Sequence, residues 1–244
     1  MTYDIRRLGL TDTLRCGAEL RSIGNASRTL EQGVQSMAAF LHAELVDGRT
    51  GTRACALVRG YMTVDYGDLP DDLKSAAGKG RKKRKTDPRT RCLVLLGSAG
   101  DRPEWNSRAT SVHHKVVVFD SIDAVESAPM FAEMIRELGL DLNDVVAPAS
   151  EISKRPERPS GVFFVPQAAE SPFITDKKNF VQPEQIESVV GFGGMLRNGQ
   201  TLCMILFSRT GLTAEASARF KTLALDVRAG LFAASDLPTF ATRA

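Results

Sequence analysis

Hydrophobic residues recur every three to four positions in two stretches near the N-terminus, which is the spacing of one buried face of an α-helix. The first stretch covers residues 10–23, and the second starts after Ser27 or Thr29, either of which could cap a helix. Asp47 and Gly48 end the second stretch. The pattern therefore predicts two helices within residues 1–46.

Shorter apolar runs fill the middle of the chain, and their length indicates strands. They cover residues 54–64, 92–96, 115–119 and 161–165, and a longer run covers 186–209. Asn198 and Gly199 divide the long run into two strands. This dipeptide predicts a type I′ hairpin turn, because both residues tolerate the left-handed conformation that such a turn needs.

Helical spacing returns twice further along the chain. One helix, interrupted or restarted at Pro129, is expected within residues 121–139, and a last helix over residues 213–235. The sheet core then spans residues 54–209, and residues 1–244 form a single domain.

Five segments upstream of the hairpin, taken with the strand–hairpin–strand–helix ending, resemble a known family. The segments are Ala54-Cys-Ala-Leu-Val-Arg59, Tyr66-Gly-Asp-Leu-Pro70, Arg91-Cys-Leu-Val-Leu-Leu96, Pro103-Glu-Trp-Asn106, and Phe164-Val-Pro166 with Ser171-Pro-Phe-Ile174. Most of the chain is similar to the GAF-type cytoplasmic sensory domain at the N-terminus of many bacterial histidine kinases and related signalling proteins. The resemblance implies an α/β (α+β) fold of the GAF/PAS kind. A central, mainly antiparallel sheet would carry the terminal helices on one face, with loops and a helix over the other.

Charge and hydropathy limit the partners. The net charge of +3 is too small to indicate a nucleic-acid surface by itself. A local basic run, Lys79 to Lys85, is read as a solvated loop, with contact to an anionic partner as the alternative. The longest apolar runs have strand length, so no membrane span is expected.

The compartment is expected to be the cytoplasm. The N-terminus has no apolar signal core, and the four cysteines are spaced as single residues inside apolar or helical runs. Such cysteines are typical of reduced core thiols and not of disulfides or a zinc site.

Catalytic motifs are lacking, and the chain is predicted not to be an enzyme. None of the three histidines falls in a known catalytic or metal-binding motif, and no nucleophile can be paired with a general base. The run Gly191-Phe-Gly-Gly194 leads into a strand, whereas a phosphate-binding loop leads into a helix. Its glycines indicate a bulge or a close backbone approach.

A ligand pocket over the sheet is the main functional hypothesis. The resemblance places a cover loop at residues 166–185, and the long polar connection before residue 115 holds the single tryptophan. His114 is preferred over His113 because the resembling modules carry a histidine just before this strand. Trp105 as a core plug and His114 as a structural histidine are the alternatives. The candidate ligand-binding residues are Trp105, His114, Phe131, Phe164, Phe180 and Phe192.

The sequence thus favours a stand-alone cytoplasmic sensor that binds a small molecule or redox cofactor of unidentified chemistry. It would signal to a separate protein and form a homodimer through its terminal helices, since residues 213–234 carry more apolar positions than one sheet-facing side needs. The alternative is a protein-interaction or structural module whose pocket is filled by its own side chains.

Overall fold

The computed structural model describes residues 1–78, 86–111, 114–146, 161–232 and 236–241. The basic run 79–85, which the sequence analysis singled out, lies outside these residues. His113 also lies outside them.

A six-stranded sheet forms the centre of the described structure. Its strands are β3 (Cys55–Asp65), β4 (Arg91–Gly100), β5 (Val116–Phe119), β6 (Phe163–Val165), β7 (Ser188–Met195) and β8 (Thr201–Ser208). Their order is β5-β4-β3-β8-β7-β6, and every neighbouring pair is antiparallel. A small parallel pair, β1 (Tyr3–Asp4) with β2 (Leu45–Val46), ties the N-terminus to the end of the second helix.

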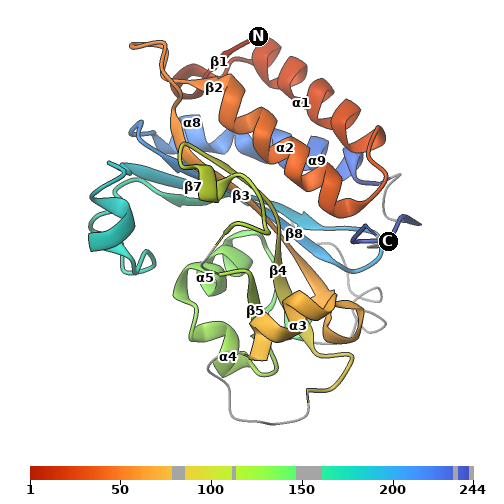
Figure 1. Ribbon diagram of the computed structural model, residues 1–244. Helices are drawn as coiled ribbons and strands as arrows, with labels where there is room; N and C mark the ends of the chain where they lie inside the picture. The colour runs from red at the N-terminus through yellow and green to blue at the C-terminus, as the bar shows by residue number, and fades with distance from the viewer. Residues whose placement is uncertain (79–85, 112–113, 147–160, 233–235, 242–244) are drawn as a thin grey trace.

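Helices cover both faces of the sheet (Figure 1). One face carries α1 (Leu10–Asn25), α2 (Leu30–Glu44), α8 (Ala214–Ala218) and α9 (Phe220–Gly230). The other carries α4 (Ile122–Glu126), α5 (Pro129–Glu137), α6 (Leu142–Val146) and the short π-helix η4 (Lys177–Val181). The remaining short elements are η1 (Ile5–Arg7), η2 (Tyr66–Asp68), α3 (Asp71–Gly78) and η3 (Pro103–Trp105). This arrangement confirms the predicted fold class.

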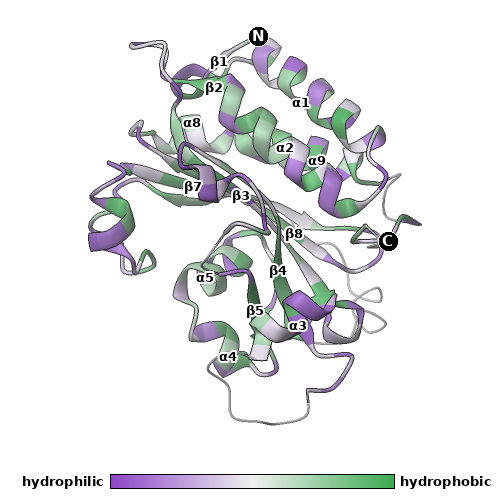
Figure 2. Ribbon diagram, in the orientation of Figure 1, coloured by the Kyte–Doolittle hydropathy of each residue, from purple (hydrophilic) through white to green (hydrophobic). Residues whose placement is uncertain are grey.

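Two hydrophobic cores form, one on each side of the sheet, because successive residues of a strand point to opposite faces. On β3, Val58 and Met62 enter the core beneath α1, α2 and α9, whereas Leu57 and Tyr61 enter the core beneath α4, α5 and the loops. Figure 2 shows hydrophobic stretches along β4 and β5 of the sheet and along α2. β3 is buried on both faces, which explains its nearly continuous apolar sequence.

The cap predicted for the second helix is present. The Thr29 side chain accepts a hydrogen bond from the Gln32 backbone N–H at 3.0 Å, so Thr29 and not Ser27 is the N-cap. The restart at Pro129 is also confirmed, since α5 begins at that residue.

The predicted last helix is divided and shorter than expected. Arg219 and Thr222 donate backbone hydrogen bonds to carbonyls three residues back, which interrupts the α-helical ladder between α8 and α9. α9 ends at Gly230, and the next described residues do not continue it. At this end the helix meets α1 closely, because a Cβ on Gly230 would lie 2.8 Å from the Leu20 carbonyl oxygen.

The hairpin between β7 and β8 corrects the predicted turn type. Met195 pairs with Thr201, which leaves five residues in the connection and excludes a two-residue type I′ turn. The Gly199 N–H donates to the Leu196 carbonyl at 3.0 Å, and Gly199 has φ of +77°, whereas Asn198 keeps a negative φ. The turn is therefore the longer kind that closes with a left-handed glycine. The turn type therefore follows from the pairing of β7 with β8 and not from the Asn198-Gly199 dipeptide.

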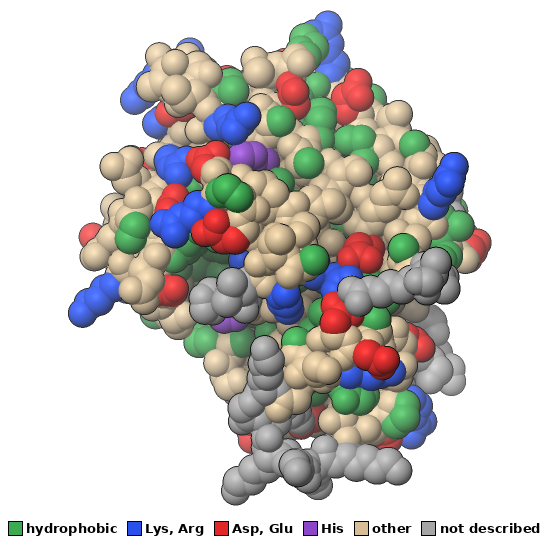
Figure 3. All heavy atoms as spheres, viewed as in Figure 1, with side chains coloured by type: hydrophobic (Ala, Val, Ile, Leu, Met, Phe, Trp, Pro, Cys, Tyr) green, Lys and Arg blue, Asp and Glu red, His purple; other side chains and the backbone are tan. Residues whose placement is uncertain are grey.

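None of the described helices combines the length and the apolar character needed to cross a bilayer. On the face drawn in Figure 3, Lys and Arg side chains are interspersed with Asp and Glu side chains, so the described part of this face has no broad field of one sign.

Candidate functional site

A cavity of about 530 Å³ lies on the face of the sheet opposite the terminal helices. Its size falls in the range of small-molecule sites. It is lined by strand residues Leu57, Arg59, Tyr61, Val117 and Phe207, by Arg102, Glu104, Trp105 and His114, by Ser127 to Phe131, and by Phe173 to Asp176 with Asn179 and Phe180.

The floor of the cavity comes from β3 and β8. Leu57, Arg59 and Tyr61 alternate along β3 and therefore point to the same face. Leu57 pairs with Phe207 in the register of the two strands, which places the Phe207 ring beside the β3 residues.

Aromatic side chains form the walls. The Trp105 and Phe180 rings meet edge to face at 5.6 Å between centroids, and Phe180 meets Phe207 in the same way at 5.0 Å. On the other side, Tyr61 and Phe131 meet at 5.0 Å. Edge-to-face contacts of this kind fix ring orientation and contribute beyond the area they bury. The cavity is thus a preformed space between rings held by elements that are far apart in the chain.

Charges divide between the floor and the mouth. Among the described ionisable residues that line the cavity, Arg59 is buried, with 8% of its surface exposed, whereas Arg102, Glu104, His114 and Asp176 are exposed. The Arg59 guanidinium donates a hydrogen bond to the Tyr61 hydroxyl at 3.2 Å. A cation therefore lies on the floor, and groups of both signs lie at the mouth.

A chain of ion pairs starts at the wall of the cavity. The Arg102 guanidinium lies over the Trp105 ring, 4.9 Å from its centroid, and its Nε donates to Glu184 Oε1 at 2.8 Å. The other oxygen of Glu184, Oε2, accepts from Arg209 at 2.9 Å. Glu184 thus holds together the arginine that covers Trp105 and an arginine that follows β8.

The series of ion pairs continues to the face of the sheet that carries α2. Arg209 pairs with Asp101, which follows β4, and Asp101 Oδ1 lies 3.2 Å from His42 Nε2 on α2. Burial lowers the pKa of His42, and the attraction of Asp101 opposes this effect. Side chains in contact therefore connect Trp105 at the cavity with α2 on the opposite side of the sheet.

The described residues give little support for thiol or metal chemistry in this protein. Burial raises the pKa of Cys16, Cys55 and Cys203 to about 12, which keeps these thiols protonated and unreactive. No disulfide links any of the four cysteines. The described residues contain no group of three or more His, Cys, Asp or Glu side chains placed to hold a metal ion.

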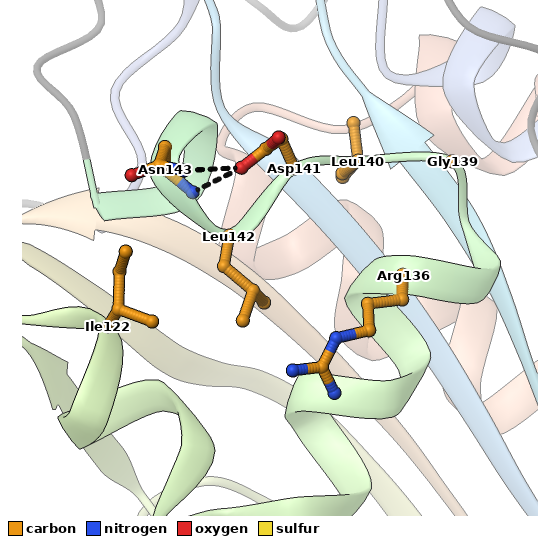
Figure 4. Close-up of a pocket in the computed structure, with 7 residues that line it drawn as sticks. All are labelled: Ile122, Arg136, Gly139, Leu140, Asp141, Leu142 and Asn143. Carbon is orange, nitrogen blue, oxygen red and sulfur yellow. Dashed lines mark hydrogen bonds between the residues drawn. The ribbon is translucent and has the colours of Figure 1, made fainter.

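A second hollow, of about 420 Å³, lies beside α5 and α6 (Figure 4). Among the described residues, no aromatic side chain lines it. Its arginine, Arg136, already pairs with Glu126 at 2.8 Å and Glu133 at 3.4 Å, and Asp141 accepts hydrogen bonds from the backbone and side chain of Asn143. Its polar groups thus hold the local chain together, and the larger cavity is the better candidate site.

Comparison with solved structures identifies proteins of similar fold. The free methionine-R-sulfoxide reductase of Neisseria meningitidis, determined with its substrate, is 11% identical, with a TM-score of 0.50 over 92% of this chain and 90% of that one. The GAF domain of a phosphoenolpyruvate-protein phosphotransferase from Coxiella burnetii is 12% identical over 90% and 92%, with a TM-score of 0.47. The GAF domain of the Acinetobacter phosphotransferase is 12% identical over 89% and 91%, with a TM-score of 0.46. No protein-family model and no curated protein matches the chain.

The chain has a GAF-type fold. Its architecture is the one that the sequence resemblance implied: an antiparallel sheet with α1, α2 and α9 on one face, and a helix with loops on the other. The cover loop implied at residues 166–185 contributes Phe173 to Asp176, Asn179 and Phe180 to the cavity.

Four of the six candidate residues line this cavity of the GAF-type fold: Trp105, His114, Phe131 and Phe180. Trp105 is part of the wall and not a fully buried plug. His114 is exposed and has φ of +56°, a left-handed conformation that few residues other than glycine adopt.

Phe164 and Phe192 do not line it, and this placement corrects the prediction. Phe192 is fully buried on the helical side, where its ring lies 5.3 Å from that of Phe220, and Phe164 packs against the same core. On each strand the adjacent position faces the cavity side, as Phe163 does on β6. Because side chains alternate along a strand, an error of one position exchanges the faces.

Other residues that line the cavity were not predicted from the sequence, among them Arg59, Tyr61 and Phe207. A signal for Arg59 was available, since a charged residue in the middle of a buried strand requires a reason. Tyr61 and Phe207 carried no such signal, because aromatic residues are ordinary in strands.

Proposed function

We propose that the protein is a sensory domain that binds a small molecule in the cavity between Trp105, Phe131 and Phe180 and passes the state of that cavity to a separate protein. The observation that supports this proposal is the space itself. About 530 Å³ is left between rings that contact one another at their edges. A module that filled its pocket with its own side chains would leave no such volume, so the interaction-module alternative is less favoured.

The proposed role is binding without catalysis. Three thiols are held protonated by burial, and Glu104 and Asp176, the carboxylates that line the cavity in the described part of the chain, are exposed. Exposed carboxylates lack the surroundings that tune an acid or base for catalysis. We place the domain in the cytoplasm, in keeping with four cysteines that form no disulfide.

The ion-pair chain suggests how occupancy of the cavity would reach the helices. A ligand that displaces Trp105 also moves the Arg102 guanidinium above it, and Arg102 is joined through Glu184, Arg209 and Asp101 to His42 on α2. We propose this chain as the link between the cavity and the surface that meets the partner.

A homodimer through the terminal helices remains a proposal, with a changed set of residues. Leu231, an apolar position of the predicted seam, is fully buried within the chain and its side chain packs beside Gly33, so it cannot contact a second copy. Exposed leucines are available instead: Leu10 (69%) and Leu14 (55%) on α1, and Leu225 (55%) on α9. They make the outer surface of these helices the proposed seam.

Light scattering tests the seam. Leu14→Glu and Leu225→Glu should each convert a dimer into monomers at tens of micromolar protein. Ile122→Glu is the matched control, because Ile122 is an exposed apolar residue on the other side of the sheet (37%). A wild-type monomer at this concentration, or dimers of both leucine variants, would reject the seam.

A neutral aromatic compound tests binding in the cavity. N-phenyl-1-naphthylamine should quench Trp105, the single tryptophan of the chain, and raise the melting temperature. Thr175→Phe places a ring at an exposed position that lines the cavity and should weaken this binding. Thr222→Phe makes the same change at an exposed position on α9, outside the lining, and should bind as the wild type does.

The outcomes separate the two functions. Saturable quenching that Thr175→Phe weakens and Thr222→Phe does not would support a ligand cavity. No change in fluorescence or melting temperature with this compound, indole or naphthalene would reject it and favour an interaction module.

A further inference from the structure

We propose that residues 236–241 form a strap that docks reversibly on the start of α2, and that occupancy of the cavity releases it. This inference rests on the proposed small-molecule site and names the segment whose docking that site controls.

The strap satisfies backbone groups that α2 cannot satisfy itself. The first N–H groups of a helix have no carbonyl partner within the helix. In α2, the Leu30 N–H donates to the Pro238 carbonyl at 3.2 Å. The next one, the Glu31 N–H, donates to the Thr239 carbonyl at 2.9 Å. Residues 236–241 therefore act as part of the N-terminal cap of a helix that lies far away along the chain.

The strap is held by a small set of contacts. Four of its six residues are exposed, and Thr239 and Phe240 are half-buried. The Phe240 side chain packs against the core between the sheet and the terminal helices. A segment with little buried apolar surface opens locally at a small cost in free energy. The strap can therefore leave α2 without unfolding the domain, and Phe240 is its main anchor.

Arg108 joins the strap to the loop that carries Trp105. Its guanidinium carbon lies over the Phe240 ring, 5.6 Å from the centroid, which is a cation–π contact. The same guanidinium donates to Glu31 Oε1 at 2.6 Å and to Asp72 Oδ2 on α3 at 2.8 Å. Arg108 is buried, with 8% of its surface exposed. One side chain thus contacts the strap, the start of α2 and α3, so its displacement would disturb the place where the strap docks.

Trp105 and Arg108 belong to one folded turn of the connection between β4 and β5. The Trp105 N–H and the Asn106 side chain both donate to the Arg102 carbonyl, at 2.9 Å and 3.0 Å. Residues 107–111 close the next turn with a backbone hydrogen bond of 3.1 Å. A segment with such internal hydrogen bonds moves largely as one piece. A ligand that displaces Trp105 at the cavity wall would therefore also move Arg108.

The direction of the effect follows from these contacts. Movement of Arg108 away from the Phe240 ring removes a contact that holds the strap, so a bound ligand should weaken docking. Coupling between two equilibria is reciprocal. Loss of docking should therefore make Trp105 easier to displace and tighten binding in the cavity by a similar factor.

Hydrogen exchange of single amides, followed by NMR on the full chain, measures docking. The Leu30 and Glu31 N–H groups report on the strap, because they donate to its carbonyls. The Gln32 N–H is the internal control, since its acceptor is the Thr29 hydroxyl of the same helix at 3.0 Å.

A matched pair of variants tests the anchor. Phe240→Ala should raise the exchange rates of Leu30 and Glu31 by at least about tenfold and leave that of Gln32 nearly unchanged. Leu237→Ala makes a similar truncation at an exposed position of the same strap (36%) and should behave as the wild type does.

N-phenyl-1-naphthylamine tests control by the cavity. At saturation it should raise the exchange rates of Leu30 and Glu31 in the wild type by at least about fivefold. Phe240→Ala should bind the compound more tightly than the wild type by a similar factor, whereas Leu237→Ala should bind it equally.

Each outcome decides a separate point. Exchange at Leu30 and Glu31 that Phe240→Ala does not change would overturn the strap and leave the small-molecule site standing. Binding of the compound without faster exchange in the wild type, or without tighter binding in Phe240→Ala, would overturn the coupling and also leave the site standing. Failure of the compound to bind would reject the site, and control of the strap with it. If Phe240→Ala does not fold, Phe240→Leu, which keeps an apolar side chain but loses the ring, and the wild-type exchange rates still decide.

Discussion

Replacement of Glu184 by glutamine should destabilise the protein and disturb the cavity wall together. Glu184 is almost fully buried, with 9% of its side chain exposed, and it accepts hydrogen bonds from Arg102 Nε at 2.8 Å and from Arg209 at 2.9 Å. Glutamine keeps the volume and the backbone carbonyl that accepts from Arg209 Nε. The change therefore removes one negative charge between two arginines.

The size of the effect follows from the exposure of the partners. A hydrogen bond to a charged group contributes about 1.5–3 kcal/mol. The Arg102 and Arg209 side chains are 45% and 30% exposed, so water solvates them once the carboxylate is gone. The amide oxygen still accepts one bond. With that discount for solvent, the loss should be about 1–2 kcal/mol for the pair of interactions.

Urea denaturation followed by circular dichroism measures this loss as a shift of the midpoint at constant slope. Glu187→Gln is the control, because it makes the same change at an exposed position three residues along the same segment, where about 0.5 kcal/mol or less is expected. Trp105 emission of the folded protein should also change in Glu184→Gln alone, since its arginine cover loses its anchor. A loss below about 0.5 kcal/mol with unchanged emission would refute the role of Glu184.

Three further predictions concern pH, helix packing and the basic run. Burial lowers the pKa of His42 below its unfolded value of 6.5, so its contribution to stability is complete above pH 6.5 and is lost as the pH falls through the folded-state pKa. His42→Gln should remove a slope of at most about 1.4 kcal/mol per pH unit from urea titrations below pH 6.5, and an unchanged slope would contradict the assignment. Gly230→Ala should destabilise by about 1–3 kcal/mol, because its Cβ would lie 2.8 Å from the Leu20 carbonyl oxygen and 2.9 Å from the Arg21 Cα; Gly78→Ala, where nothing lies within 4 Å, should be neutral or stabilising, and equal effects would refute the packing. Deletion of residues 79–85 should leave the melting temperature nearly unchanged in calorimetry, because like charges of such density cannot be buried, and a fall of more than about 10 °C would show that the run is structural.

Local pattern was sufficient for much of the fold. The spacing of apolar residues gave both N-terminal helices, the strands and the restart at Pro129, because burial of one face imposes a period that the sequence must keep. Thr29 capped its helix as its hydroxyl allows, and the ordered segments from Ala54 to Ile174 indicated the GAF-type fold. The long connection and the cover loop visible in the sequence pointed to Trp105, His114, Phe131 and Phe180, and these four line one cavity. Their role in ligand binding stays a prediction.

Tertiary structure alone decided the features that depend on register and on distant partners. Phe164 and Phe192 were assigned to the wrong face, since a period of two fixes which residues share a side but not which side meets the cavity. The hairpin turn followed the Met195–Thr201 pairing and overrode the preference of Asn198-Gly199. The places of Tyr61 and Glu184 depend on residues far away along the chain, since Tyr61 meets Phe131 and Glu184 pairs with Arg102. Such contacts arise only when the sheet has closed, because the energy that places these residues comes from partners that no local window of sequence contains.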